Sequence, residues 1–229
     1  MKVLVIAAHP DDEVYGVGGT IVKQVKCGDV VYVCLLTEGV TTQYRNTRDE
    51  ISLTNLIEQK KKETLKAAKI LGIKEVFFFD LPDMRLDTIA HSEVNQPIEE
   101  CIVKLLPDIV YTHHWGDVNK DHRLAFESTM VAVRPGLNSP IKRVLIYETP
   151  SSSEWNAPIL TNQFMPNIFV DISDVLPLKI QAMEAYESEL RPFPHPRSIE
   201  AVTIYAKKRG LEVGKKVVEC FMLIREIID

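Results

Sequence analysis

The chain of 229 residues lacks any apolar run near the ~18–20 residues that a membrane-spanning helix requires. It also lacks an excess of positive charge: 27 Lys and Arg stand against 32 Asp and Glu, which gives a formal net charge of -5. A general nucleic-acid-binding surface needs a basic excess, because it must pair with phosphates. We therefore expect neither a membrane span nor a nucleic-acid partner.

Cysteine is scarce, and no two of the four cysteines have the C-x-x-C spacing of zinc ribbons or thiol redox sites. Scattered single cysteines are typical of reduced core residues in an intracellular protein. A signal-peptide pattern is also missing, because Met1-Lys2 leads directly into a strand whose end carries polar chemistry. These absences predict a cytoplasmic protein.

A complete dinucleotide-binding fingerprint is missing as well. Gly16 and Gly18 follow the first apolar run, but the third glycine of G-x-G-x-x-G would fall at Ile21. The acidic residues just before these glycines would also repel a pyrophosphate. We predict instead that Gly18 and Gly19 allow close backbone packing beneath the acidic loop.

Short apolar runs alternate with helical patterns through the first 148 residues. Strands are expected at 3–8, 30–36, 76–79, 109–112 and 144–147, with helices between them that include 51–71, 93–106 and 124–133. Such alternation implies parallel strands joined by right-handed crossovers. The sequence therefore predicts an α/β fold with a Rossmann-like open, mainly parallel sheet, core order 3-2-1-4-5, and helices on both faces.

The rhythm changes after residue 148. A strand at 168–171, helices at 174–190 and 198–208, and a strand at 217–224 are expected there as a C-terminal extension. No internal repeat or long linker separates the two parts, and 45% hydrophobic residues suffice for a large core. We expect one domain over 1–229, with a core at 1–148 and a segment at 149–229 that closes the site.

The first strand ends in an unusual cluster of polar residues. His9 and Pro10 are followed by three consecutive acids, Asp11, Asp12 and Glu13. Burying carboxylates at a strand end is costly unless a cation compensates their charge. Imidazole and carboxylate together suit zinc or a similar first-row ion better than magnesium or calcium.

A second polar cluster, residues 113–123, follows the fourth strand. In the order 3-2-1-4-5 the strand order reverses between the first and fourth strands, and ligands bind at such a reversal. A catalytic zinc has about three protein ligands, which His9, one of the two aspartates and His122 would supply. The other aspartate would act as general base and then as general acid. The spacing does not say which is which, and a turn, helix cap or helix start would also explain these residues.

Two motifs resemble those of the PIG-L/LmbE-like family of zinc-dependent N-deacetylases. They are Ala8-His9-Pro10-Asp11-Asp12-Glu13 and Asp121-His122-Arg123, and the helix end at 67–72 and the tail around 209–221 fit as well. The resemblance implies a Rossmann-like sheet and hydrolysis of the acetamide of N-acetylglucosamine-type groups. It further implies zinc held by His9, Asp12 and His122, with Asp11 as general base. Glu13 and Asp121 are expected to support these groups.

The chain departs from the family pattern at Asn119. Many members have a histidine there, three residues before the last ligand, where it helps to stabilise the oxyanion. An asparagine amide can donate a hydrogen bond to developing charge, but it carries no positive charge. Either Asn119 or one of His113 and His114 would take that role. The alternative is that both histidines are structural: one would form a wall of the site, and the other would be a buried residue that makes hydrogen bonds.

Contacts with substrate are expected from three regions. Trp115 would stack on a sugar face or else pack its own loop. His195 and Arg197 would meet a hydroxyl or phosphate, although Arg197 also fits a surface charge at a helix start. The loop 41–48 is a third candidate wall of the sugar pocket. We interpret Lys60, Lys61 and Lys62 as a solvated helix face.

The sequence thus predicts a metal-dependent enzyme that removes an acetyl group from an N-acetylated amino sugar or sugar conjugate. The alternatives are a hydrolase of another amide, such as a thiol-conjugate amidase, and a non-catalytic nucleotide- or sugar-binding module. Zinc is the expected cofactor, and other divalent first-row metals would suit the same ligands. The expected partner is the sugar substrate, and a homo-oligomer is compatible with the sequence.

Overall fold

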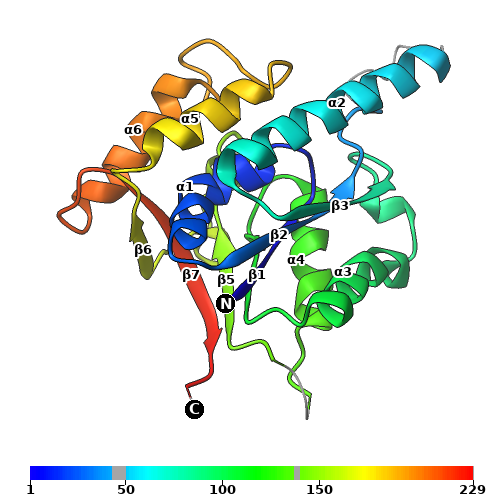
Figure 1. Ribbon diagram of the computed structural model, residues 1–229, viewed down its shortest axis with the longest axis horizontal. Helices are drawn as coiled ribbons and strands as arrows, with labels where there is room; N and C mark the ends of the chain where they lie inside the picture. Colours follow the sequence, from blue (N-terminus) through cyan, green and yellow to red (C-terminus); the bar gives the residue numbers. More distant parts are fainter. Residues whose placement is uncertain (43–49, 137–139, 229) are drawn as a thin grey trace.

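The computed structural model of the protein describes residues 1–42, 50–136 and 140–228, with side chains from residue 52 onward in the second range. Within these residues, seven strands form one sheet in the order β3-β2-β1-β4-β5-β7-β6 (Figure 1). The strands are β1 (Lys2–Ala7), β2 (Val30–Thr37), β3 (Glu75–Leu81), β4 (Ile109–His113), β5 (Arg143–Tyr147), β6 (Ile168–Asp171) and β7 (Val218–Glu226).

The first five strands are parallel, which confirms the predicted Rossmann-like sheet and its core order 3-2-1-4-5. The C-terminal extension joins the same sheet, because β7 pairs antiparallel with both β5 and β6. The helices are α1 (Asp12–Lys26), α2 (Glu50–Leu71), α3 (His91–Leu105), α4 (Lys120–Ala132), α5 (Leu176–Ala185) and α6 (Ile199–Leu211). Across the described ranges, none has the length and apolar character needed to traverse a bilayer.

Helices cover both faces of the sheet, with α1, α2, α5 and α6 on one side and α3 and α4 on the other (Figure 1). The alternation along β1 serves both layers, since Val3 and Val5 belong to one hydrophobic cluster and Leu4 and Ile6 to the other. All four side chains are fully buried. The carboxyl end of β1 therefore delivers His9 and the acids that follow it into the interior rather than onto the surface.

Two helices differ from their predicted bounds in ways that shape the site. Helix α4 begins at Lys120 instead of 124, because the Asn119 side chain accepts a hydrogen bond from the Asp121 backbone N–H and caps it at 2.9 Å. Helix α5 ends at Ala185, short of the predicted 190. The chain leaves the helix there, and the Tyr186 hydroxyl donates to Glu13 at 2.6 Å.

Glycines let helix α1 lie directly against its neighbours. A Cβ on Gly19 would stand 2.8 Å from Ile172 Cγ2, and one on Gly18 would stand 3.3 Å from Lys179 Cγ. This confirms the close packing predicted for the pair. The same is true of Gly16, where a Cβ would come within 2.2 Å of the Tyr147 ring. Helix α1 can approach β5, α5 and the chain after β6 this closely only because these three positions have no side chain.

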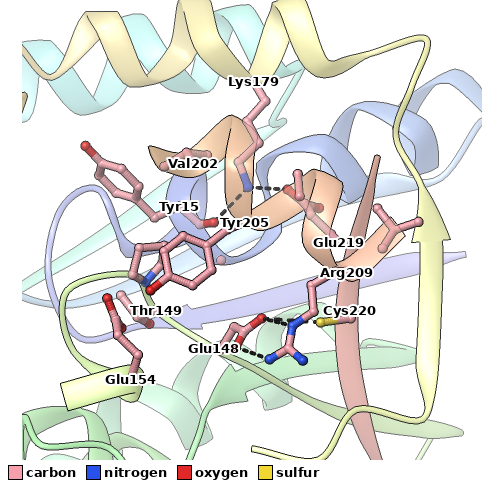
Figure 2. A pocket seen from close by; sticks show the side chains of 14 residues that line it. Tyr15, Glu148, Thr149, Glu154, Lys179, Val202, Tyr205, Arg209, Glu219 and Cys220 are labelled. Carbon is pink, nitrogen blue, oxygen red and sulfur yellow. Dashed lines mark hydrogen bonds and ion pairs between the residues drawn. The ribbon is translucent and has the colours of Figure 1, made fainter. Parts of the chain in front are cut away.

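A buried ion pair from α5 and β7 also packs against the backbone of α1 (Figure 2). Lys179 Nζ donates to Glu219 Oε1 at 2.6 Å and to the Tyr15 carbonyl at 2.8 Å. Glu219 accepts from the backbone N–H groups of Gly19 and Thr20, at 2.8 and 2.6 Å. The pair therefore binds the C-terminal extension to the helix that begins with Asp12.

Candidate metal and catalytic site

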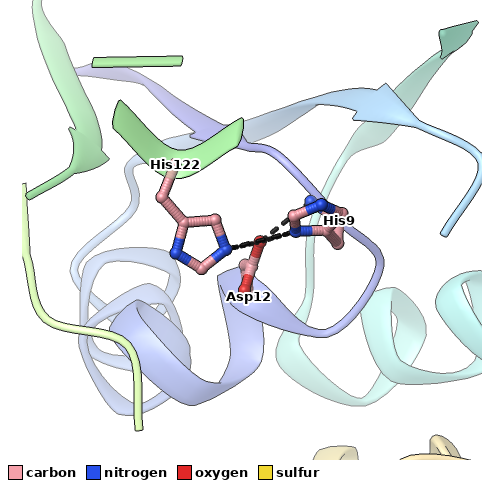
Figure 3. A group of neighbouring side chains, drawn as sticks. All are labelled: His9, Asp12 and His122. Carbon is pink, nitrogen blue, oxygen red and sulfur yellow. Dashed lines mark hydrogen bonds and ion pairs between the residues drawn. The ribbon is translucent and has the colours of Figure 1, made fainter. Parts of the chain in front are cut away.

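Three predicted metal ligands converge at the switch point of the sheet. His9 lies in the loop after β1, Asp12 is the first residue of α1, and His122 lies in the first turn of α4. Their side chains point toward one another (Figure 3). His9 Nδ1 lies 3.2 Å from His122 Nε2, and each of these atoms lies 3.3 Å from Asp12 Oδ2. The three donor groups thus lie within 4.8 Å of one another.

The burial and chemistry of these donors fit a divalent metal. Asp12 and His122 are almost completely buried, and within the described part of the chain Asp12 Oδ1 has no hydrogen-bond partner. Burial raises the pKa of Asp12, but the neighbouring His122 and His113 lower it further, so the net pKa lies well below its usual range. Two imidazoles and an ionised carboxylate are a donor set suited to zinc and related first-row ions.

Carboxylates contact the outward-facing nitrogen of His9. Asp121 Oδ2 lies 3.2 Å from His9 Nε2, and Asp83 Oδ1 lies 3.6 Å from the same atom. Asp121 also accepts the backbone N–H of Leu86 at 3.1 Å, which holds its carboxylate in place. Asp121 therefore lies where sequence reasoning expected a supporting group. The contact between Asp83 and His9 was not predicted. The only local signal for it was the position of Asp83 just after β3.

His122 has a supporting carboxylate that sequence reasoning missed. Asp117 Oδ2 lies 3.2 Å from His122 Nδ1, and it accepts the Ser153 hydroxyl at 2.7 Å while Ser152 donates to Oδ1. Burial raises the pKa of Asp117, but the charge of His122 lowers it to about 2. A carboxylate on Nδ1 directs Nε2 toward His9 and Asp12. The sequence did contain a signal for this contact, since Asp117 and His122 both lie in the polar cluster of residues 113–123.

Asp11 is not one of the three grouped ligands, and its backbone is left-handed, with φ at 108°. Its N–H donates to Glu13 Oε2 at 3.1 Å, so Glu13, for which a supporting role is predicted, contacts Asp11. Among the described residues, its carboxylate accepts no hydrogen bond, but Arg197 Nη1 lies 3.0 Å from Oδ2. Burial raises the pKa of Asp11 well above its usual range, and Arg197 opposes that rise. A non-glycine residue in this backbone region is a strained conformation found at functional sites.

A cavity of ≈ 270 Å³ opens beside His9 and Asp11. Asn119 and Arg197 also line it, as does Thr42 from the predicted loop wall 41–48, of which 43–48 lies outside the described residues. Asn119 uses its side-chain oxygen to cap α4, and its amide nitrogen lies 3.3 Å from Met84 Sδ. The remaining lining residues are Pro10, Gly39, Asp83, Met84 and Glu189.

His113 and His114 do not line this cavity. His113 Nε2 accepts the Ala8 backbone N–H at 2.9 Å, and its ring stacks on His122 with 4.0 Å between centroids. Burial lowers the pKa of His113 to about 4. The His114 Nε2 lies 2.9 Å from the Asn162 carbonyl oxygen. Both rings are fully buried, one behind a donor histidine and the other against a loop.

Trp115 and His195 also lie outside the cavity wall. Trp115 Nε1 donates to the Thr161 carbonyl at 2.7 Å, and its ring packs against Phe126 at 5.6 Å, so it packs its loop. His195 Nδ1 accepts the Arg197 backbone N–H at 3.1 Å. Of the three residues expected to contact substrate, the structure brings Arg197 to the cavity.

The interpretation of Lys60 as part of a solvated face is wrong. Its side chain is 4% exposed, and its Nζ lies 2.5 Å from Glu189 Oε1. Lys61 is partly exposed and pairs with Asp80. Lys62 is exposed, so the interpretation as a solvated face fits Lys62 best. Sequence reasoning missed the burial because the residues that cover Lys60 come from beyond α5.

The fold and the donor set together define a Rossmann-like α/β protein with a candidate divalent-metal site at its switch point. A family model described as PIG-L, GlcNAc-PI de-N-acetylase, matches residues 4–133. The chain belongs to this family, as the resemblance of its motifs implied.

Known relatives extend the match beyond the family model. A diacetylchitobiose deacetylase from Thermococcus kodakarensis is 36% identical over 82% of this chain and 70% of the relative. A 4-oxalmesaconate hydratase from Pseudomonas putida is 25% identical over 93% of this chain and 81% of its own. Among solved structures, the N,N'-diacetylchitobiose deacetylase from Pyrococcus horikoshii superimposes with a TM-score of 0.76 at 26% identity, covering 98% of this chain and 84% of that one.

Proposed function

We propose that the protein is a zinc-dependent N-deacetylase that hydrolyses the acetamide of an N-acetylated amino sugar or sugar conjugate. The observation that carries the proposal is the buried donor set of His9, Asp12 and His122 beside a cavity that Asp11 also lines. Two relatives described as diacetylchitobiose deacetylases support the substrate class. Other divalent first-row ions suit the same donors.

His9, Asp12 and His122 would hold the metal through two ring nitrogens and one carboxylate. A divalent ion bound there supplies a Lewis acid and lowers the pKa of water. Asp117 and Asp121 contact the outer nitrogens of the two histidines, so the ring orientations are set by the protein.

Asp11 is the proposed general base. It takes one proton from the attacking water as the water oxygen bonds to the acetyl carbonyl carbon. Asp11 then delivers that proton to the amine nitrogen as the C–N bond breaks, which yields acetate and a free amine. We assign the hydrogen bond to the carbonyl oxygen to the Asn119 amide, because Asn119 lines the cavity and His113 and His114 do not.

We propose that residues 1–229 act as one domain, in which the C-terminal extension closes the cavity. Glu189 and Arg197 from that extension line the same cavity as His9 from the core, and the Lys179–Glu219 pair binds the extension to α1. A cytoplasmic location and a homo-oligomeric state stay predictions of the sequence.

Removal of the metal is expected to abolish acetate release from N-acetyl sugars, and added zinc is expected to restore it. The assay measures acetate and free amine from N-acetylglucosamine and N,N'-diacetylchitobiose before chelation, after chelation and after metal return. Because one relative is described as a hydratase, acetate itself must be measured rather than loss of substrate.

Lack of acetate from every N-acetyl sugar and sugar conjugate tested, with zinc present, would contradict the proposed reaction. Release of the amine and the matching acid from a thiol-conjugate amide, with no hydrolysis of any N-acetyl sugar, would favour the alternative amidase. Sugar binding without turnover would favour the binding module.

Asp117→Asn is expected to weaken zinc binding by about 10–100-fold, because an amide supports the His122 ring less well than a carboxylate. A competition titration of the purified protein with a zinc chelator measures this directly. Asp87→Asn is the matched control, since Asp87 forms an exposed ion pair with Lys120, the first residue of α4, the helix that also contains His122. Equal zinc affinity in the two variants would show that Asp117 does not support the ligand.

A further inference from the structure

Four side chains of alternating charge form a chain of contacts that ends at Asp11. Lys60 Nζ lies 2.5 Å from Glu189 Oε1, Glu189 Oε2 lies 2.8 Å from Arg197 Nη1, and that nitrogen lies 3.0 Å from Asp11 Oδ2. Lys60 lies in α2, Glu189 in the chain after α5, Arg197 in the segment before α6 and Asp11 in the loop after β1. Elements distant in sequence therefore converge on one carboxylate.

Arg197 is held in this position from several directions. Its Nε donates to Ser151 Oγ at 2.9 Å, and its guanidinium lies 5.6 Å from the centre of the Tyr15 ring. The side chain is 20% exposed, so most of the charge is withdrawn from water and depends on its carboxylate partners. A guanidinium anchored at several points is a rigid group, unlike a surface arginine.

The Asp11 carboxylate is otherwise weakly held. Within the described residues neither oxygen accepts a hydrogen bond, and both are buried. Its strained backbone fixes where the side chain starts but not how the carboxylate is turned. Among the described residues, the Arg197 guanidinium is the charged group in ion-pair contact with this carboxylate.

We propose that Arg197 is a positioning residue for the general base: it orients the Asp11 carboxylate toward the reacting water, and Glu189 with Lys60 fixes Arg197. This inference rests on the proposed function, because it assigns Arg197 a part in that reaction. It replaces direct substrate binding as the main role of Arg197, although Arg197 lines the cavity. A base displaced by about 1 Å is expected to cost about 10²-fold in rate.

Arg197→Ala is therefore expected to lower kcat for deacetylation of an N-acetyl sugar by about 10²-fold, with KM and zinc content little changed. Added guanidinium ion at millimolar concentration is expected to restore part of kcat, because the cavity gives it access to the vacated position. Arg197→Lys, which keeps the charge but loses the planar fork, is expected to give an intermediate kcat.

Arg209→Ala is the matched control. Arg209 is 14% exposed and pairs with Glu148 at 2.6 Å in a different hollow (Figure 2), which Asp11 does not line. Its removal is expected to leave kcat unchanged, with no response to guanidinium. Circular dichroism and thermal melting of each variant separate loss of folding from loss of turnover.

A raised KM with an unchanged kcat, in either Arg197→Ala or Arg197→Lys, would overturn the proposal and favour direct substrate binding. Equal guanidinium effects on the Arg197 and Arg209 variants would overturn it as well. If the alanine variant does not fold, the kcat and KM of Arg197→Lys decide. An inactive wild-type protein would instead contradict the proposed function, so the two failures are distinguishable.

Discussion

Asp11→Asn is expected to lower kcat by about 10²–10⁴-fold while the protein still binds its metal. The amide cannot accept the water proton, yet His9, Asp12 and His122 are all retained as donors. Asparagine is also tolerated better than most residues at a positive φ such as the 108° of Asp11. Steady-state deacetylation kinetics and metal analysis of the same preparation measure the two quantities together.

A matched control for this substitution exists elsewhere in the chain. Asp80 also has a positive φ, 51°, and is an exposed residue paired with Lys61. Asp80→Asn is expected to leave turnover unchanged. Near-normal turnover of Asp11→Asn would rule out Asp11 as the base. Loss of its metal would instead assign Asp11 to the ligands.

Lys179→Met is expected to lower the free energy of unfolding by about 3–5 kcal/mol. The substitution leaves the Glu219 carboxylate buried with only the two backbone N–H groups of α1, and the Tyr15 carbonyl loses its donor. The substitution leaves one buried charge uncompensated, and the free-energy cost of that charge is larger than the stability that the ion pair itself contributes. Urea or guanidinium chloride unfolding, with the midpoint and slope both fitted, measures the change.

Two further variants test that explanation. Lys66→Met removes an exposed lysine whose ion pair with Glu187 is 3.7 Å long, and it is expected to cost well under about 1 kcal/mol. Combining Lys179→Met with Glu219→Gln removes both buried charges and is expected to recover part of the loss. A double variant less stable than the single one would mean that packing, rather than charge, explains the effect.

Much of the fold followed from local patterns in the sequence. Apolar runs marked each parallel strand, and the reversal of strand order then placed the loops after β1 and β4 at one crevice. That step brought His9 and His122 together across 113 residues of sequence, as the 3.2 Å separation of their ring nitrogens confirms. The prediction succeeded because it needed only the strand order and the polar residues at two strand ends.

The division of labour between Asp11 and Asp12 did not follow from local patterns. Both are acids after the same strand, and only the family resemblance separated them. In the structure Asp11 has a left-handed backbone and contacts Arg197, whereas Asp12 contacts the histidines. Periodicity carries no information on such a φ value, since it reports burial rather than backbone conformation.

Ion pairs between residues far apart in the sequence could not be predicted from local patterns either. Lys60 lies in a run of three lysines, which favours a solvated face, yet a carboxylate 129 positions later buries it. No spacing rule links α2 with the chain beyond α5. The sequence predicted that the polar cluster of residues 113–123 is chemically important. It did not predict that Asp117 contacts His122, or that Ser153 donates to Asp117 and Ser152 lies beside His122.

The contact between Gly16 and the Tyr147 ring has a consequence for the chemistry. Asp12 lies one helical turn before Gly16, and the Tyr147 hydroxyl bonds to the carbonyl of Ile6 in β1 at 2.7 Å. The depth at which Asp12, a proposed metal ligand, lies is thus set by the absence of a side chain on Gly16, one turn further along the same face of α1. A larger residue at position 16 is expected to displace Asp12 without changing any residue that lines the cavity beside His9.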